Sequence, residues 1–287
     1  MIELEPKHEF LVGIDSDGCA FDTMELKHKE CFCPNHIKHW KLQGVSKYAR
    51  EAADFVNLYS KSRGINRFPA LVEVLEWLQR RPEVKARGIK IEIPQSLLDW
   101  IENETKLGNP ALEKAVAETG DPGLTRALEW SKGINASVAD MVEGVPPFPF
   151  VRESIEKLCE TADVMVVSAT PQEALRREWA EHDLARHVVG IFGQESGSKA
   201  EHLRMAAKYP AGHTLMVGDA PGDHKAAVAN DALFFPINPG DEEASWRRFY
   251  AEGIDRFLSG NFAGKYQDDL LAEFDKYLPE QPPWETE

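Results

Sequence analysis

The chain has 287 residues, of which 43% are hydrophobic and 28% charged, a composition typical of a globular protein of about two domains. Its formal net charge of −15 argues against a nucleic-acid-binding protein, which would normally carry a basic surface. The apolar runs are four to six residues long, and a membrane span needs about 20 such residues. We therefore expect neither nucleic acid nor a membrane as a partner.

The N-terminus and the cysteines point to a cytoplasmic protein. Residues 1–8 lack the positively charged head and apolar stretch of a signal peptide. The four cysteines, at 19, 31, 33 and 159, are sparse for this length and fit a reducing compartment better than a disulfide framework. A cytoplasmic location is the expectation that follows.

Five short apolar runs predict buried parallel strands. They occupy residues 9–14, 163–168, 188–192, 213–217 and 232–236. From 163 onward they alternate with helical stretches, which is the pattern of a parallel α/β sheet. Such strands are apolar without interruption because helices cover both faces of the sheet. The predicted fold class is therefore α/β, with a Rossmann-like parallel sheet as its core.

The segment between the first two predicted strands has a different pattern. Residues 45–62 and 69–80 carry apolar side chains at helical spacing. Pro69, Pro94 and Pro122 stand where helices can begin, and the proline-rich stretch 144–149 suits a stiff linker back to the sheet. We expect an inserted helical domain over 22–145, within a core formed by 1–21 and 146–240.

Two further helical stretches follow the turn at 238–240. Aromatic and aliphatic side chains lie on one face of each, including Trp246 and Phe249 on the first and Leu270 and Phe274 on the second. We expect residues 241–287 to form a C-terminal helical extension that packs on the core. A homodimer contact through the same side chains is the other interpretation.

A cluster of soft metal ligands lies early in the predicted insertion: His28, Cys31, Cys33, His36 and His39. Zinc is the metal that such residues commonly bind. The spacing is poor, however, because two cysteines separated by one residue do not share a helix face. We also expect Pro34 to interrupt the segment. The favoured interpretation is an ordinary first helix of the insertion, with zinc as the alternative.

Carboxylates follow two of the predicted strands directly. Asp15 and Asp17 come after the first strand, and Asp219 and Asp223 come after the fourth, about 200 residues later. Sites in open parallel sheets form outside the carboxyl ends of the strands. The two acidic segments therefore predict one metal-centred site assembled from distant parts of the chain.

Two further strand ends, those of the second and third strands, carry a hydroxyl segment and a lysine. Ser168-Ala169-Thr170 follows the second strand, and Lys199 follows the third. In this order, the four segments resemble the motifs of the haloacid dehalogenase superfamily, in its phosphatase branch. The resemblance covers about residues 1–22 and 146–237, and the helical insertion after the first motif resembles the α-helical cap of that family. Cys19 departs from the family pattern, and Lys199 lacks the proline that often follows it.

The resemblance implies a phosphatase mechanism. Asp15 would be the nucleophile that forms a phospho-aspartate, and Asp17 would be the general acid and base. Ser168, the backbone amides of Ala169 and Thr170, and Lys199 would bind the phosphate, since Pro171 can open a helix whose N-terminus attracts anions. An aspartate at position 17 favours phosphate esters over dehalogenation or phosphonate cleavage.

The resemblance also implies the cofactor. Mg²⁺ would be held by the Asp15 carboxylate, the backbone carbonyl of Asp17, and Asp219, with Asp223 bound directly or through water. A hard cation prefers such a set of oxygen ligands. The expected function is hydrolysis of a small phosphorylated metabolite, such as a sugar phosphate. A phosphomutase of the same superfamily and a non-catalytic protein that binds a phosphorylated ligand remain the alternatives.

Overall fold

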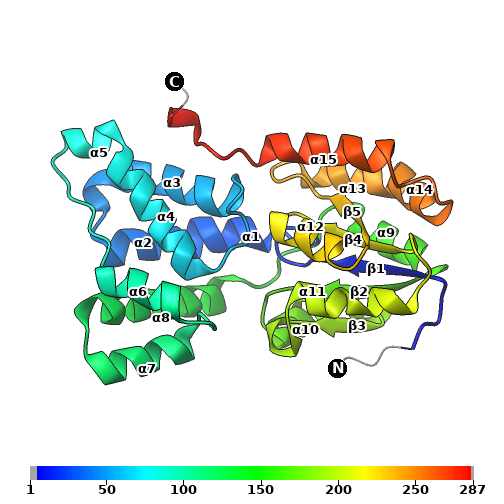
Figure 1. Ribbon diagram of the computed structural model, residues 1–287, viewed down its shortest axis with the longest axis horizontal. Coiled ribbons are helices and arrows are strands. Elements are labelled where there is room, and N and C mark those ends of the chain that lie inside the picture. The colour runs from blue at the N-terminus through cyan, green and yellow to red at the C-terminus, as the bar shows by residue number, and fades with distance from the viewer. Residues whose placement is uncertain (1–4, 286–287) are drawn as a thin grey trace. The chain divides into compact units, whose positions relative to one another are not determined.

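The computed structural model describes residues 5–285. It contains a five-stranded sheet of β1 (Phe10–Ile14), β2 (Ala162–Val167), β3 (Gly190–Phe192), β4 (Thr214–Gly218) and β5 (Leu233–Pro236) (Figure 1). All strand pairs are parallel, in the order β3-β2-β1-β4-β5. Each of the five predicted strands is present, with ends shifted by at most two residues. The predicted α/β class is thus confirmed.

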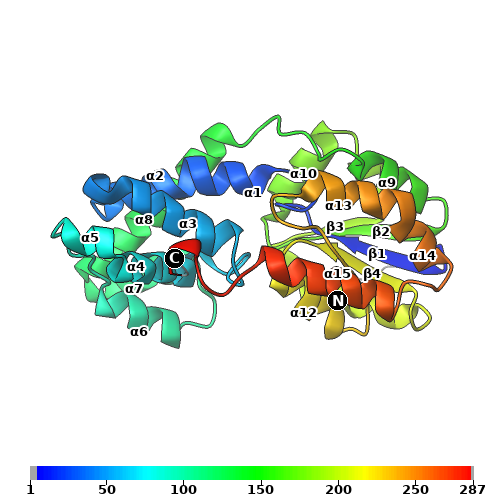
Figure 2. The same cartoon turned by 90° about the horizontal axis from the view of Figure 1, so that it is seen from above.

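Helices cover both faces of the sheet, which explains the continuous apolar strands. Figure 2 shows the sheet between α9 (Val151–Leu158) and α13 (Glu242–Arg248) on one side and α12 (Pro221–Val228) and α15 (Lys265–Tyr277) on the other. Alternate strand residues belong to two separate hydrophobic clusters, with Val12 and Val166 in one and Leu11 and Met165 in the other. The core therefore lies on both sides of β1.

The chain forms two units. One contains the described residues through Met24 together with Glu143–Pro279, and the other contains Glu25–Val142 together with the described residues from Glu280 onward. The first holds the sheet, and its remaining helices are α1 (Thr23–Leu26, shared at its end with the second unit), α10 (Gln172–Glu181), α11 (Lys199–His202) and α14 (Ile254–Leu258). We call the first the sheet unit and the second the helical unit.

The helical unit has its own apolar core. Its helices are α2 (Cys33–His39), α3 (Ser46–Leu58), α4 (Arg67–Arg80), α5 (Pro82–Ala86), α6 (Gln95–Asn103), α7 (Asn109–Thr119) and α8 (Pro122–Met141). Pro94 and Asp121 are the residues that precede α6 and α8, and the Asp121 carboxylate accepts the backbone N–H groups of Gly123 and Leu124. This capping satisfies amides that the first helical turn leaves without partners.

The prediction that Pro34 interrupts its segment is wrong. The backbone is helical from α1 through a π-helical turn, Lys27–Phe32, into α2. The amide of Cys33 donates to the carbonyl of His28, five residues back, and Pro34 then falls in the first turn of α2. The proline, which has no N–H to donate, lies directly after the π-helical turn, at the point where the backbone bonding changes to that of α2.

The predicted C-terminal extension is divided between the two units. α13, α14 and α15 belong to the sheet unit, whereas the described residues from Glu280 onward belong to the helical unit. There the indole of Trp284 lies 4.3 Å from the Arg81 guanidinium and 5.7 Å from the Phe55 ring. Of the predicted extension, 241–287, the residues 280–285 thus belong to the helical unit and not to the core. Throughout residues 5–285, each helix is too short or too polar to cross a bilayer.

Candidate active site

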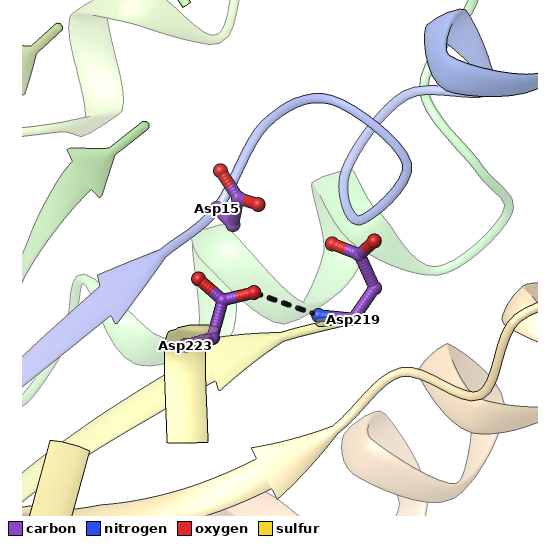
Figure 3. A group of neighbouring side chains, drawn as sticks. All are labelled: Asp15, Asp219 and Asp223. Carbon is purple, nitrogen blue, oxygen red and sulfur yellow. Dashed lines mark hydrogen bonds between the residues drawn. The ribbon is translucent and has the colours of Figure 1, made fainter. Parts of the chain in front are cut away.

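The carboxyl ends of the two central strands bring three aspartates together. Asp15 follows β1, Asp219 follows β4, and Asp223 lies in the first turn of α12 (Figure 3). One carboxylate oxygen from each lies within 4.8 Å of the others, and all three residues are buried. Because β1 and β4 are neighbours in the sheet, this is where the order of the strands reverses, the usual place for a ligand in such folds.

Lys199 supplies positive charge to this group. Its Nζ lies 2.7 Å from Oδ2 of Asp15 and 2.6 Å from Oδ1 of Asp223. The lysine begins α11, and Ser198 caps that helix by accepting the amide of Glu201, whose side chain in turn accepts the amide of Ser198. This capping box holds the backbone from which the lysine extends.

Both oxygens of Asp223 have partners. Oδ1 accepts from Lys199, and Oδ2 accepts the backbone amides of Asp219 and Ala220 at 3.2 and 3.1 Å. A Cβ on Gly218 would lie 2.4–2.6 Å from the Asp223 side chain. Glycine at the end of β4 therefore makes the close approach of this carboxylate to the strand possible.

Excess negative charge dominates the electrostatics of the site. Burial, with the nearby carboxylates of Asp223 and Asp219, raises the pKa of Asp15 well above its usual value, against the lowering effect of Lys199. Burial alone would lower the pKa of Lys199, but the surrounding carboxylates raise it instead. Three carboxylates against one ammonium thus increase the proton affinity of both groups. Hard oxygen ligands with surplus negative charge fit a divalent cation.

Asp17 lies outside the group of three carboxylates. Its Oδ1 accepts a hydrogen bond of 2.5 Å from Oγ1 of Thr23, which is the first residue of α1 and is buried. The carbonyl of Ser16 accepts the amides of Cys19, Ala20 and Phe21, and Gly18 adopts a φ of +80° in the turn between them. No spacing rule in the sequence indicates the hydrogen bond from Thr23 to Asp17.

Ser168 lies directly after β2 and is buried. Its amide donates to the carbonyl of Phe192 at the end of β3, and its Oγ accepts the amide of Thr170 at 3.2 Å. The Thr170 amide, expected to bind phosphate, therefore has an internal partner in this structure. Pro171 precedes α10 as anticipated.

The other candidate residues lie apart from this centre or are chemically unsuited to act there. Burial, together with the nearby carboxylates, raises the pKa of Cys19 well above its usual value, so its thiol stays protonated. Cys31, Cys33 and His36 are buried in the helical unit, where Nδ1 of His36 lies 2.6 Å from the carbonyl of Phe32. Within residues 5–285, the three aspartates form the group whose ligand atoms could share one ion.

Comparison with known proteins adds neighbours but no family assignment. No family model and no curated protein matches the chain. A haloacid dehalogenase-like hydrolase from Bacteroides fragilis is 13% identical, with 83% of this chain and 93% of that chain covered and a TM-score of 0.49. A haloacid dehalogenase-like family protein from Streptococcus pneumoniae is 12% identical, with 88% and 98% covered and a TM-score of 0.47.

A structure described as a phosphoglycolate phosphatase, from Lactobacillus delbrueckii subsp. bulgaricus, is also similar. It is 14% identical to this chain, with 85% of this chain and 92% of that chain covered and a TM-score of 0.47. Two of these three proteins carry the name of the superfamily that the sequence motifs resemble.

Proposed function

We propose that this protein is a Mg²⁺-dependent phosphatase that hydrolyses small phosphate monoesters through a phospho-aspartate at Asp15. The observation that carries the proposal is the convergence of Asp15, Asp219 and Asp223 at the carboxyl ends of β1 and β4, where Lys199 pairs with Asp15 and Asp223. Phosphoryl transfer depends on an aligned nucleophile and on positive charge around the phosphoryl oxygens. Asp15 would be the nucleophile, and Lys199 would contribute the positive charge.

The Asp15 carboxylate is held for attack. Oδ1 accepts the amide of Ser16 at 2.8 Å and Oδ2 accepts from Lys199, so the orientation of the carboxylate is fixed. Attack on phosphorus forms the bond from Asp15 to the phosphoryl group and breaks the ester bond. Ser168 and Lys199 are the side chains proposed to bind the phosphoryl oxygens.

Asp17 would transfer protons in both halves of the reaction. It would protonate the leaving alcohol oxygen as the ester bond breaks, and then accept a proton from the water that attacks the phosphorylated Asp15. The hydrogen bond from Thr23 holds its carboxylate. This second step releases phosphate and restores the Asp15 carboxylate and the proton on Asp17.

The three buried carboxylates, with the main-chain carbonyl of Asp17, would hold the Mg²⁺ ion. When bound, the ion would offset the charge of these carboxylates and of the phosphoryl oxygens. The proposed substrates are sugar phosphates or similar metabolites. The chain's net charge of −15 argues against a polyanionic substrate such as nucleic acid, which would be repelled.

The test is phosphate release from a panel of phosphorylated metabolites, with Mg²⁺ and with a chelator, on the wild type, Asp15→Asn and Asp163→Asn. Asp163 is the matched control because it is an equally buried carboxylate of the sheet unit whose Oδ2 is held by the amides of Lys7 and His8 and by the Tyr209 hydroxyl. Asp15→Asn should lower the rate at least about a thousandfold, because the nucleophile is lost.

Three outcomes separate the candidate functions. Release that requires Mg²⁺ and Asp15 but not Asp163 supports the proposal. Interconversion of two phosphorylated isomers, without free phosphate, would assign a phosphomutase. A folded wild type that binds Mg²⁺ and turns over no ester in the panel would contradict the phosphatase.

A further inference from the structure

Two buried tryptophans hold the loop that carries the proposed acid and base. The site loop, Ser16–Phe21, contains Asp17 and connects β1 with α1. Nε1–H of Trp179, on α10, donates to Oγ of Ser16 at 2.9 Å. Nε1–H of Trp246, on α13, donates to the carbonyl of Cys19 at 2.8 Å. The two bonds meet the loop on either side of Asp17 in the sequence.

These bonds are fully enclosed. Trp179, Trp246, Ser16 and Cys19 are each 0% exposed. The Phe21 ring lies edge-on against Trp179, with a centroid distance of 5.7 Å, and the Ser16 hydroxyl itself donates to Glu178 at 2.9 Å. A hydrogen bond without competing water is costly to break, because the groups it leaves behind stay unsatisfied.

The buried indoles of the sheet unit have hydrogen-bond acceptors, whereas three buried indoles of the helical unit have none within residues 5–285. Trp130, in the helical unit, is also 0% exposed, yet its Nε1 has no hydrogen-bond partner within the described part of the chain. Nε1 of Trp40 and Nε1 of Trp100, in side chains that are 7% and 9% exposed, also have no partner there. Burial of a tryptophan in this protein therefore does not by itself bring its N–H to an acceptor. In the sheet unit, both fully buried indoles reach the same six-residue loop.

We infer that Trp179 and Trp246 are positioning residues for Asp17, an inference that rests on the proposed phosphatase function. α13, in the C-terminal extension, thereby becomes part of the catalytic apparatus rather than only a cover for the sheet. A loosened site loop would displace Asp17 more than Asp15, because the Asp15 amide donates to the carbonyl of Val217 in β4 and its Oδ2 is paired with Lys199. Proton transfer to the leaving group would therefore suffer most.

This division gives a selective readout. An alkoxide leaving group needs a proton from Asp17, whereas p-nitrophenolate leaves readily without one. In Trp246→Phe and Trp179→Phe, the kcat/KM for an alkyl phosphate, which reports the steps up to release of the alcohol, should fall about tenfold, which is about 1.4 kcal/mol of transition-state stabilisation. The kcat/KM for p-nitrophenyl phosphate should change less than about twofold, because its leaving group needs no proton from Asp17 in that half of the reaction. A loss of folded protein would lower both rates by the same factor.

Trp130→Phe is the matched control, because it removes an equally buried indole that makes no such bond. It should leave the ratio of alkyl to aryl turnover unchanged even if it lowers the melting temperature. A double-mutant cycle adds specificity for Trp179: if it acts through Ser16, Trp179→Phe should add little to the effect of Ser16→Ala.

Hydrogen exchange of the Cys19, Ala20 and Phe21 amides tests the loop without any turnover. These amides donate to the Ser16 carbonyl and should exchange faster in the Trp179 and Trp246 variants than in Trp130→Phe. Unchanged exchange, or an alkyl-to-aryl ratio that stays at the wild-type value in both variants, would overturn the inference. A wild type inactive on every ester would contradict the proposed function, and the exchange rates would still decide the role of the tryptophans.

Discussion

The two units of this protein treat buried polar groups in opposite ways. In the helical unit, Asn35, Asn57 and Ser60 each bond the backbone carbonyl four residues earlier. These neutral groups are satisfied within one helical turn, and the buried guanidinium of Arg81 is paired with Glu51 and Glu83. In the sheet unit, three buried carboxylates from distant segments lie together, and Lys199 pairs with two of them, Asp15 and Asp223.

The difference suggests that the buried polar groups of the helical unit stabilise the fold, whereas most buried carboxylates of the sheet unit serve the site. All four buried carboxylates of residues 5–285 lie in the sheet unit: Asp15, Asp163, Asp219 and Asp223. Oδ2 of Asp163 accepts from two amides and a hydroxyl, whereas the other three carboxylates repel one another. Gathering like charges away from water costs stability, so the acidic group is best explained by the cation and phosphoryl group that it would bind.

Removal of the Lys199 ammonium, which pairs with Asp15 and Asp223, should produce the largest change in stability. Lys199→Met leaves the carboxylates without their ammonium, and we expect a loss of about 3–5 kcal/mol in the free energy of unfolding without Mg²⁺. Urea denaturation measures this loss, and saturating Mg²⁺ should recover part of it. Lys265→Met removes an exposed partner of Asp269 and should cost less than about 1 kcal/mol. Equal losses in the two variants would contradict the comparison.

The helical unit should respond to pH through its buried histidine. Burial lowers the pKa of His36 from 6.5 to about 4, against the raising effect of its bond to Phe32. Between these values the unfolded chain binds the proton more tightly, so stability is lost as the pH falls from 6.5 toward 4. The full loss is about 3 kcal/mol. His36→Gln should flatten this slope in urea denaturation series; a slope that persists would assign it to other groups.

The hydrogen bond to Asp17 should matter for activity more than for stability. Thr23→Val keeps the shape of the side chain and removes the donor to Oδ1 of Asp17. We expect about a tenfold lower kcat on alkyl phosphates, because a misplaced acid transfers its proton less efficiently. Thr23→Ser, which keeps the hydroxyl, should restore most of the rate. A serine variant as slow as the valine variant would assign the effect to packing.

The smallest effect should come from a neutral buried amide. Asn57→Ala in α3 removes the bond from Nδ2 to the Ala53 carbonyl. The expected cost is roughly 1 kcal/mol of unfolding free energy, with kcat unchanged. A large loss of activity in this variant would show that the buried polar groups of the helical unit are not merely structural.

Much of the fold was predictable because the relevant signals are local. Buried parallel strands leave continuous apolar runs, and the residues that follow them are the ones that meet at the edge of the sheet. Asp15, Asp219 and Lys199 could therefore be placed together before their distances were known. The helical spacing over residues 69–80 likewise corresponds to most of α4.

The features that the sequence did not indicate depend on packing between distant segments. The π-helical turn before Pro34 needs a backbone bond from Cys33 to His28 that no residue pattern signals. The contacts of Trp284 with Arg81 and Phe55 join residues about 200 positions apart, and no sequence pattern near Trp284 indicates them. The bonds from Trp179 and Trp246 to the site loop join residues more than 160 positions apart.

The most direct test of the proposed phosphatase is to trap its covalent intermediate. The wild type would be mixed with Mg²⁺ and a substrate identified in the panel, quenched in acid within one turnover, and digested for mass spectrometry. We predict a phosphoryl group on Asp15, absent from Asp15→Asn and present in Asp163→Asn. Turnover with the phosphoryl group on another residue, or on none under conditions that trap the intermediate of a known phospho-aspartate enzyme, would contradict the role assigned to Asp15.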